Sequence, residues 1–213
     1  MTKDEITTYT PDGVLILDKP EGMTSHDCVA RIRRLYNTKK VGHTGTLDPM
    51  ATGVLPILIG RAAKASEYLT AEEKGYEAIM RLGIVTDTED TTGQILSRAE
   101  VLPTEEEVYL AAASFLGEYD QVPPMYSALK VNGQKLCDLA RNGITVERKA
   151  RTVCIRELTC TRIPGSKTDY RLSVLCSKGT YIRTLCADIG TKLGCGAAMA
   201  ALRRMPVCIT NLM

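Results

Sequence analysis

The sequence has 213 residues, of which 44% are hydrophobic and 24% charged, an ordinary composition for a globular protein. Its net charge of +2 does not by itself indicate a nucleic-acid-binding protein. No apolar run approaches the roughly 20 residues that a membrane span requires, and the N-terminal MTKDEITTYTPDG lacks the apolar stretch of a secretory signal. We therefore expect a cytoplasmic protein with no membrane segment, folded as a single domain over residues 1–213.

Cysteine and histidine usage argues against a metal or redox site. Eight cysteines are scattered from Cys28 to Cys208, and no pair has the C-x-x-C spacing typical of zinc sites and redox dithiols. Several stand within apolar runs, where a free cysteine behaves as a small hydrophobe. The two histidines, His26 and His43, are too few for a histidine-rich metal site. We expect reduced, buried thiols and no metal ligands.

Charge is segregated along the chain although its sum is small. The stretch Ala30–Lys40 holds five basic residues and no acid. Two further basic clusters comprise Arg141, Arg148, Lys149 and Arg151, and Arg203 with Arg204. Acids gather instead at Asp87–Asp90 and Glu105–Glu107. This separation fits a basic cleft for a polyanion, and it fits solvated helix faces equally well.

The first elements in chain order are a strand, a helix and two more strands. Val14–Pro20 predicts a short buried strand, and Thr24 with Asp27 resembles a capping box that opens a helix. The apolar face of that helix would carry Val29, Ile32, Leu35 and Tyr36. The apolar residues 52–60 predict a strand, with Pro56 indicating an edge or a bulge. Residues 75–83 alternate, so Tyr76, Ala78, Met80 and Leu82 would share one face.

The second half of the chain alternates helices and strands irregularly. Thr104 and Glu107 form a second capping box, followed at helical spacing by Val108, Ala111, Ala112, Phe115, Leu116 and Tyr119. Asn132–Gly133 predicts a hairpin, with a short helix ending near Gly143. Strands follow to about Cys160 and over residues 169–177. A last helix carries Ile182, Leu185, Cys186, Ile189 and Leu193, and ends at Gly194. This order favours an α+β fold with a mixed, largely antiparallel sheet and flanking helices.

The stretch GHTGTLDPMATG, residues 42–53, has the composition of a functional loop. Pro49 pushes the backbone of Asp48 towards an extended conformation, and Gly42, Gly45 and Gly53 would let a substrate approach the backbone closely. A plain Asp-Pro turn is the alternative, but the density of special residues favours a site. The phosphate-loop pattern is absent. A faint likeness to the H-x-G-H of nucleotidyl transferases fails at Thr46, where the second histidine should stand.

Two further residues draw attention. Arg183 lies in the first turn of the last helix, where the helix dipole disfavours a cation, and no acid follows it at i+3 or i+4. It either seeks an anion from elsewhere, a phosphate or a remote carboxylate, or is simply exposed. Tyr76 lies on the apolar face of its strand, which is typical of a core tyrosine; lining a cleft, it could stack on a base.

At these residues the sequence resembles the TruB family of tRNA pseudouridine synthases. GHTGTLDPMATGVLPILIGRAAK is similar to the family's signature motif, LDKPEGMTSHD to its N-terminal lysine-proline motif, and GYEAIMRLGIVTDTED to its tyrosine-containing strand. PPMYSALKVNGQKL, CSKGTYIRTL and GCGAAMAALRR resemble further blocks. These stretches run in the expected order from about Val14 to Arg204.

The resemblance implies a pseudouridine synthase fold, with two lobes around a central RNA-binding cleft, and an isomerase of tRNA. Such enzymes convert a flipped-out uridine of the T loop, position 55 of tRNA, to pseudouridine without metal or organic cofactor. The family's catalytic aspartate falls on Asp48, its base-stacking tyrosine on Tyr76, and the arginine that pairs with the aspartate on Arg183. Whether Asp48 attacks C1′ or assists loss of the C2′ proton stays open.

The resemblance also implies RNA-binding residues and partners. His43 would fill the space that the flipped base leaves, and the remaining candidates for contacts to the RNA or to the site are Lys19, Pro20, Lys64, Lys178, Tyr181 and Leu202. The partner is the T stem-loop of tRNA, with no membrane and no metal, and the expected state is a monomer. Arg183, which has no acid at i+3 or i+4, would stabilise the carboxylate of Asp48.

The chain departs from the family pattern in three places. Members commonly continue into a small C-terminal RNA-binding domain of the PUA type, which we expect to be absent here. Cys137 stands where relatives usually have an aromatic residue, and the ending MPVCITNLM is unusual. The alternatives to an RNA-modifying isomerase are a non-catalytic RNA-binding or RNA-folding protein, and a nucleotidyl transferase, which Thr46 disfavours.

Overall fold

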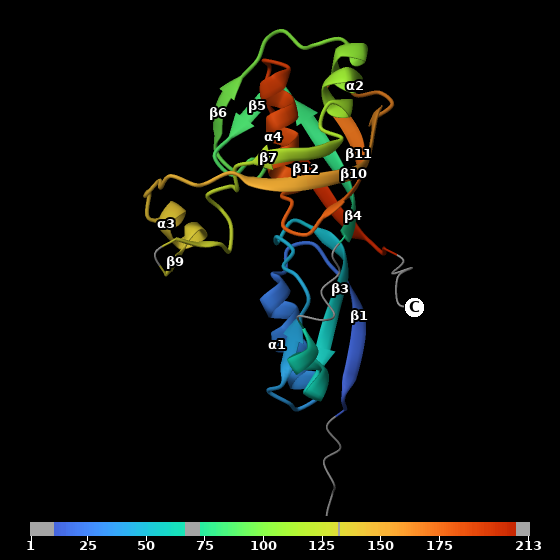
Figure 1. Cartoon of the computed structure of the whole chain (residues 1–213), viewed down its shortest axis with the longest axis vertical. Helices are drawn as coiled ribbons and strands as arrows, with labels where there is room; N and C mark the ends of the chain where they lie inside the picture. The colour runs from blue at the N-terminus through green and yellow to red at the C-terminus, as the bar shows by residue number, and fades with distance from the viewer. Residues whose placement is uncertain (1–10, 67–72, 132, 208–213) are drawn as a thin grey trace, which may run out of the picture. The chain divides into compact units, whose positions relative to one another are not determined.

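The computed structural model describes residues 11–66, 73–131 and 133–207 (Figure 1). The chain separates into two compact units. The first contains residues 1–71 with 208–213, and the second contains residues 72–207. Among the described residues, no helix is long and apolar enough to cross a membrane.

The first unit is a small antiparallel sheet covered by one helix. Its elements are β1 (Gly13–Lys19), α1 (Ser25–Leu35), β2 (Val41–His43), β3 (Thr52–Ile59) and the 3₁₀ helix η1 (Gly60–Ala65). Strand β3 pairs with β1 on one side and with β2 on the other. The core between the sheet and α1 consists of Cys28, Val29, Ile32, Val41, Leu55, Ile57 and Ile59.

Local sequence sets the start of α1, as predicted. The Thr24 side chain accepts from the backbone of Asp27, and the Asp27 carboxylate accepts in return from the Thr24 N–H, which completes the capping box. Val29 and Ile32 are buried as expected. The expectation for Leu35 is wrong: its side chain is 74% exposed, because it ends the helix beyond the reach of the sheet.

Strand β1 is only half buried, which corrects the expectation of a buried strand. Val14 and Ile16 are 51% and 62% exposed, whereas Leu15 and Leu17 pack against the core of α1. A strand in an antiparallel sheet with one covered face alternates in this way. The apolar run therefore predicts the strand correctly but not its two different faces.

Pro56 lies inside β3, without a bulge, opposite Ile16 of β1. The prediction of an edge or bulge is therefore wrong for this strand. The Pro56 carbonyl faces the β2 side and accepts from the Thr44 N–H at 3.2 Å. The pairing of β2 ends one residue earlier, at His43. The proline nitrogen thus faces a place where the ladder needs no donor.

The second unit is built on an antiparallel sheet of order β12-β4-β11-β10-β7. These strands are β4 (Glu73–Leu82), β7 (Gly117–Gln121), β10 (Arg151–Arg162), β11 (Asp169–Ser177) and β12 (Ala197–Met205). Helices α2 (Glu105–Ala113) and α4 (Ile182–Lys192) lie against it, α2 on β10 and α4 on β12 and β4 (Figure 1). The expected α+β class, with a mostly antiparallel sheet and flanking helices, is confirmed.

The alternation in β4 is confirmed residue by residue. Tyr76, Ala78, Met80 and Leu82 are all buried. The predicted apolar stripe of α4 is also buried from Ile182 to Ile189, and Gly194, with φ +74°, follows its end. Helix α2 begins with its predicted capping box but ends at Ala113. The predicted helical residues Phe115, Leu116 and Tyr119 therefore lie beyond the helix. Gly117, at φ +92°, turns the chain into β7, where Tyr119 pairs with Val153.

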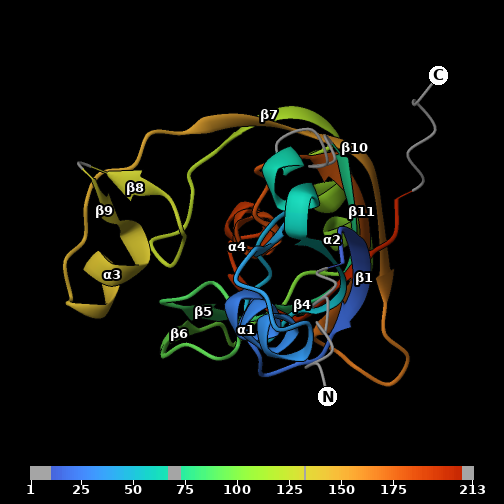
Figure 2. The same ribbon diagram turned by 90° about the horizontal axis from the view of Figure 1, so that it is seen from below.

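Two small hairpins complete the second unit. Strands β5 (Ile84–Thr86) and β6 (Ile95–Arg98) form one, and β8 (Lys130–Val131) and β9 (Gln134–Lys135) form the other, which was predicted. Asn132 of the predicted turn lies outside the described residues, and Gly133 has the φ of +82° that such a turn requires. Helix α3 (Leu136–Arg141) follows directly. Figures 1 and 2 show β8, β9 and α3 together at one side of the unit's sheet.

Candidate active site

The loop that carries Asp48 connects β2 to β3 in the first unit and is held on the N-terminal side of Asp48 by α1. Ser25, the first residue of α1, accepts from the Leu47 N–H at 2.8 Å and donates to the Leu47 carbonyl at 3.2 Å. Both Ser25 and Leu47 are buried. The backbone directly before Asp48 is therefore fixed by a single buried hydroxyl.

The C-terminal side of Asp48 is held by a buried cation. Lys19 Nζ donates to the carbonyls of Ala51 at 2.7 Å, Pro20 at 2.9 Å and Pro49 at 3.2 Å. The Pro49 carbonyl also accepts from the Gly22 N–H at 2.8 Å. The Asp48 carbonyl accepts from the Ala51 N–H at 3.0 Å, which closes a turn. With both flanks bonded, the half-buried side chain of Asp48 projects from a fixed backbone.

Lys19 is 0% exposed, so it lies at the site, beneath the loop, and not on an exposed surface. Burial lowers the pKa of its ammonium group, and the negative charges of neighbouring acidic groups, including Asp48, oppose that shift. Pro20, which follows it, is exposed and contributes its carbonyl to the same ammonium. The structure thus brings Lys19, Pro20 and Asp48 together.

The glycines of this loop have different roles. Gly45 and Gly53 have φ values of +118° and +101°, which only glycine adopts without strain. Gly42 lies in β2 without such a φ, and a Cβ there would meet nothing within 4 Å. Loop geometry therefore requires two of the three predicted glycines. Close approach of a substrate to these glycines stays a hypothesis.

Tyr76 lies in the second unit, on β4, and its side chain is buried. Across the sheet its partner on β12 is Arg204, which is 5% exposed although it belongs to a basic cluster of the sequence. Burial lowers the pKa of the Arg204 guanidinium, and an electrostatic interaction and a hydrogen bond with Tyr76 oppose the shift. Sequence reasoning missed this pair. Its signal was parity along β12, since Leu202 and Arg204 share the buried face.

Arg183, the second residue of α4, is 4% exposed, so the alternative of a solvent-exposed arginine is excluded. Its Nη1 donates to the Thr88 carbonyl at 2.9 Å, and its Nη2 donates to the Tyr126 carbonyl at 2.8 Å. Asp90 Oδ2 lies 3.8 Å from Nη1. A remote carboxylate, one of the alternatives that the sequence left open for Arg183, is therefore present, and sequence reasoning had not identified it as Asp90.

The remaining predicted residues divide between the two units. In the first, His43 is half-buried at the end of β2, and Lys64 is exposed on η1. In the second, Lys178 is exposed and Leu202 is buried on β12. Tyr181 caps α4, and its backbone N–H and carbonyl are both bonded to the Gln121 side chain, at 2.8 and 3.1 Å.

Asp48 belongs to the first unit, and Tyr76 and Arg183 belong to the second. Each unit by itself holds its candidate residues firmly. The meeting of the acid with the guanidinium stays a prediction. Within residues 11–66, 73–131 and 133–207, no cluster of histidine, cysteine, aspartate and glutamate has the arrangement of a metal site.

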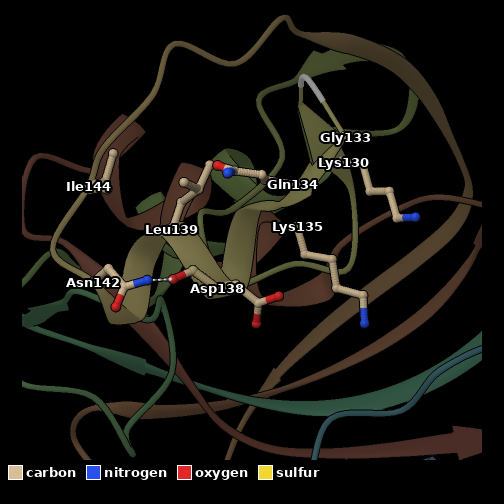
Figure 3. Close-up of a pocket in the computed structure, with 8 residues that line it drawn as sticks. All are labelled: Lys130, Gly133, Gln134, Lys135, Asp138, Leu139, Asn142 and Ile144. Carbon is tan, nitrogen blue, oxygen red and sulfur yellow. Dashed lines mark hydrogen bonds between the residues drawn. The ribbon is translucent and has the colours of Figure 1, made fainter.

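A separate hollow of about 540 Å³ lies on β8, β9 and α3 (Figure 3). Its lining consists of Lys130, Gly133, Gln134, Lys135, Asp138, Leu139, Asn142 and Ile144. Lys130 and Lys135 are direct partners across the hairpin, and the Asn142 amide donates to the Asp138 carbonyl at 3.0 Å. None of the predicted site residues lines this hollow.

Comparison with known proteins decides the family. The N-terminal domain of TruB family pseudouridylate synthases matches residues 33–182, and the C-terminal domain of tRNA pseudouridylate synthase B matches residues 183–211. The chain belongs to the TruB family. The tRNA pseudouridine synthase B of Alkaliphilus oremlandii is 54% identical over 193 residues, 91% of this chain and 64% of its own length. That of Escherichia coli O9:H4 is 49% identical over 196 residues, 92% of this chain and 62% of its own length.

Solved structures support the expected fold. A chain of a Cbf5-Nop10-Gar1 complex superposes with a TM-score of 0.69 at 34% identity, covering 91% of this chain and 48% of its own length. A chain of an H/ACA ribonucleoprotein bound to a substrate RNA containing 2′-deoxyuridine superposes with a TM-score of 0.65 at 31% identity, over 91% and 47%. The expected pseudouridine synthase fold is confirmed. This TruB family chain spans a little under two thirds of the curated relatives named above.

Proposed function

We propose that this TruB family chain is a tRNA pseudouridine synthase that isomerises uridine 55 of the T loop, with Asp48 as its catalytic carboxylate. The observation that carries the proposal is the Asp48 loop, whose backbone is bonded by Ser25 on one side and by Lys19 and Gly22 on the other. A reacting carboxylate has to be held in a productive position relative to a sugar carbon. A fixed backbone with a half-buried acid meets that need.

The reaction is an isomerisation, so its atoms and electrons balance without an added reagent. The N1–C1′ bond breaks, the uracil leaves with the electron pair and turns, and C5 forms the new bond to C1′. The proton on C5 is then lost, and N1, which carries no proton in uridine, gains one. Asp48 either attacks C1′ and forms a transient ester, which the attack of C5 displaces, or takes the C2′ proton to give a glycal, to which that proton returns when C5 bonds to C1′. The net product is the same on both routes.

Arg183 and Tyr76 assist Asp48 in this proposal. The Arg183 guanidinium pairs with the Asp48 carboxylate and keeps it charged, which preserves its nucleophilicity or basicity. Two carbonyls already orient the guanidinium, so little entropy is lost when it meets the acid. Tyr76 stacks on the extruded uracil. The support for both roles is the position of these residues in the family motifs.

The proposed substrate is the T stem-loop of tRNA, acted on by a monomer in the cytoplasm without metal or organic cofactor. A uridine in a folded loop must be flipped out, at a cost of a few kcal/mol, and His43 would occupy the vacated space. The exposed cations Lys64 and Lys178 would contact phosphates. Pro20, Tyr181 and Leu202 complete the proposed binding surface.

Release of tritium from tRNA labelled at uridine C5 tests the proposal, because only bond formation at C5 frees that proton. We expect release by the native chain and a loss of at least about 10³-fold after Asp48→Asn, the scale seen when a nucleophile is removed. Asp120→Asn, in which the amide oxygen still accepts from the Thr152 hydroxyl, serves as a matched control and should be unchanged.

Three outcomes would contradict the proposal. Undiminished release by Asp48→Asn would remove Asp48 from catalysis. Tight binding of tRNA by the native chain without any release would indicate the RNA-binding alternative. Loss of release on treatment with EDTA, with recovery on adding a divalent cation, would contradict a metal-independent reaction.

A further inference from the structure

The turn between β5 and β6 contains a residue in an unusual backbone conformation. Among the described residues other than glycine, Asn37 and Glu89 are the ones with positive φ, at +46° and +63°. A non-glycine residue in this region costs about 1 kcal/mol or more. Such a conformation persists only where the surroundings determine it.

The surroundings of Glu89 do determine it. The Glu89 carbonyl accepts from the Met199 N–H at 3.0 Å, and the Met199 carbonyl accepts from the Thr91 N–H at 2.9 Å, which ties the turn to β12. Asp90 Oδ1 accepts from the Thr88 hydroxyl and the Thr92 N–H, both at 2.9 Å. The turn is therefore closed upon itself and joined to the sheet.

Glu89 and its two neighbours interact with different residues in the first turn of α4. Thr88 supplies a carbonyl and Asp90 a carboxylate to the guanidinium of Arg183. The Glu89 carboxylate instead accepts a hydrogen bond from the Thr184 hydroxyl, with 2.5 Å between the oxygens. Thr184 is buried and follows Arg183 in the first turn of α4. Three successive residues of the turn thus hold two successive residues of the helix.

The charges around Glu89 are mixed. Burial raises the pKa of its carboxyl, whereas the hydrogen bond from Thr184 and the guanidinium groups of Arg183 and Arg148 favour the charged form. The carboxylate of Asp90 opposes it. Arg148 comes from the segment before β10 and donates through Nη1 to the Pro123 carbonyl. The Glu89 carboxylate is therefore held by one directional bond, from Thr184, together with the charges of two guanidinium groups.

We propose that Glu89 is a positioning residue for Arg183: its bond to Thr184 locks the first turn of α4 against residues 86–92, so that the guanidinium keeps one orientation. The inference rests on the proposed function, in which Arg183 pairs with Asp48. Glu89 acts through the helix and touches no reacting atom. The bond of its side chain to Thr184 fixes Arg183, and this accounts for the strained backbone conformation of Glu89.

Substitutions at both ends of the bond test this inference, with tritium release measured on T-arm RNA under single- and multiple-turnover conditions. Glu89→Ala and Thr184→Val should each lower kcat about 10-fold with KM within about 2-fold, because orientation and not affinity is lost. Glu89→Gln should stay within about 3-fold of native, since its amide oxygen still accepts from Thr184. The double variant should be no slower than either single variant.

Glu89→Gly separates the side chain from the backbone, because glycine adopts the positive φ without strain. We expect Glu89→Gly to lose as much kcat as Glu89→Ala. We expect it to unfold at a higher denaturant concentration than Glu89→Ala does. Native kcat in Glu89→Gly, or additive losses in the double variant, would overturn the inference. Thr191→Val, whose hydroxyl bonds only within α4 at the Ala187 carbonyl, and exposed Glu157→Ala are the matched controls and should be unchanged.

A second readout does not depend on catalysis. The Arg183 Nε–Hε resonance, assigned by its disappearance in Arg183→Lys, should be a single resolved signal in the native chain and should broaden or shift in Glu89→Ala and Thr184→Val. An unchanged signal in both variants would overturn the inference even if the native chain is active. Absence of tritium release by the native chain would contradict the proposed function alone, and the resonance would still decide the coupling.

Discussion

Each of the two units uses a different buried cation to hold distant segments of its backbone together. In the first, Lys19 is surrounded by three neutral carbonyls, those of Pro20, Pro49 and Ala51. In the second, Arg183 bonds two carbonyls and also lies near the carboxylate of Asp90. Both are fully or almost fully buried. Each ties backbone segments together that are far apart in the chain.

The difference lies in how the charge is compensated. The carbonyl dipoles and the neighbouring acidic groups, Asp48 among them, do not fully offset the desolvation of the Lys19 ammonium, and burial lowers its pKa. A guanidinium is less strongly hydrated, has a fixed fork of donors and stays charged. The second unit places two carboxylates near Arg183, those of Asp90 and Glu89. We infer that Lys19 serves chiefly to hold a loop, whereas Arg183 is held so that it can act on another group.

Removal of the Lys19 ammonium should have the largest effect on stability. Lys19→Met leaves three carbonyls without a charged donor, each bond being worth about 1.5–3 kcal/mol, partly offset by the desolvation that is relieved. We expect a loss of about 3 kcal/mol in the free energy of unfolding, measured by urea denaturation. Exposed Lys39→Met in the same unit should change it by less than about 0.5 kcal/mol. Equal stability of both variants would show that the bonds from the Lys19 ammonium to the three carbonyls do not stabilise the folded chain.

Replacement of the guanidinium fork should have the next largest effect, and chiefly on catalysis. Arg183→Lys keeps the charge, but a lysine cannot present two directed donors to Thr88 and Tyr126 at once. We expect kcat to fall about 30-fold, or about 2 kcal/mol of transition-state stabilisation, in single-turnover tritium release. Arg171→Lys, exposed on β11, is the control. Native kcat in Arg183→Lys would mean that a positive charge at this position suffices and that the guanidinium fork is not needed. The distinction between the roles of Lys19 and Arg183 would then fall.

The smallest predicted effect concerns Asp188, an acid on α4 that interacts with Glu89. Burial, followed by the charge of Glu89, raises the pKa of Asp188 to about 6. The folded chain therefore binds more protons than the unfolded chain between about pH 4 and 6, and the contribution of Asp188 to stability is lost as the pH rises through that window. Asp188→Asn should raise the free energy of unfolding by about 1 kcal/mol at pH 7, with allowance for partial exposure. That gain should vanish near pH 4.

Urea denaturation at several pH values measures this gain. Exposed Asp87→Asn or Asp120→Asn should show no such pH-dependent gain. A gain in the free energy of unfolding that persists at pH 4, or no gain at pH 7, would show that the ionised carboxylate of Asp188 does not destabilise the folded chain.

Sequence reasoning succeeded where the physics is local. Both capping boxes depend on side chains three residues apart, and both are present at Thr24 and Thr104. The alternation of β4 and the stripe of α4 follow from periods of 2 and 3.6 residues. Helical spacing failed at Tyr119, because Gly117 had already turned the chain into β7. Apolarity also failed at Val14, which lies on the uncovered face of β1.

The sequence alone determined the family, the antiparallel α+β fold and the loop of Asp48, and it left Arg183 either bound to an anion or exposed. Only the tertiary structure decided which atoms surround the two cations. Arg183 bonds carbonyls that are 95 and 57 residues away, and Lys19 reaches one 32 residues away. Every residue has a backbone carbonyl, so no pattern of side chains marks the ones that a buried cation will bind. Folding selects them by bringing distant backbone into reach.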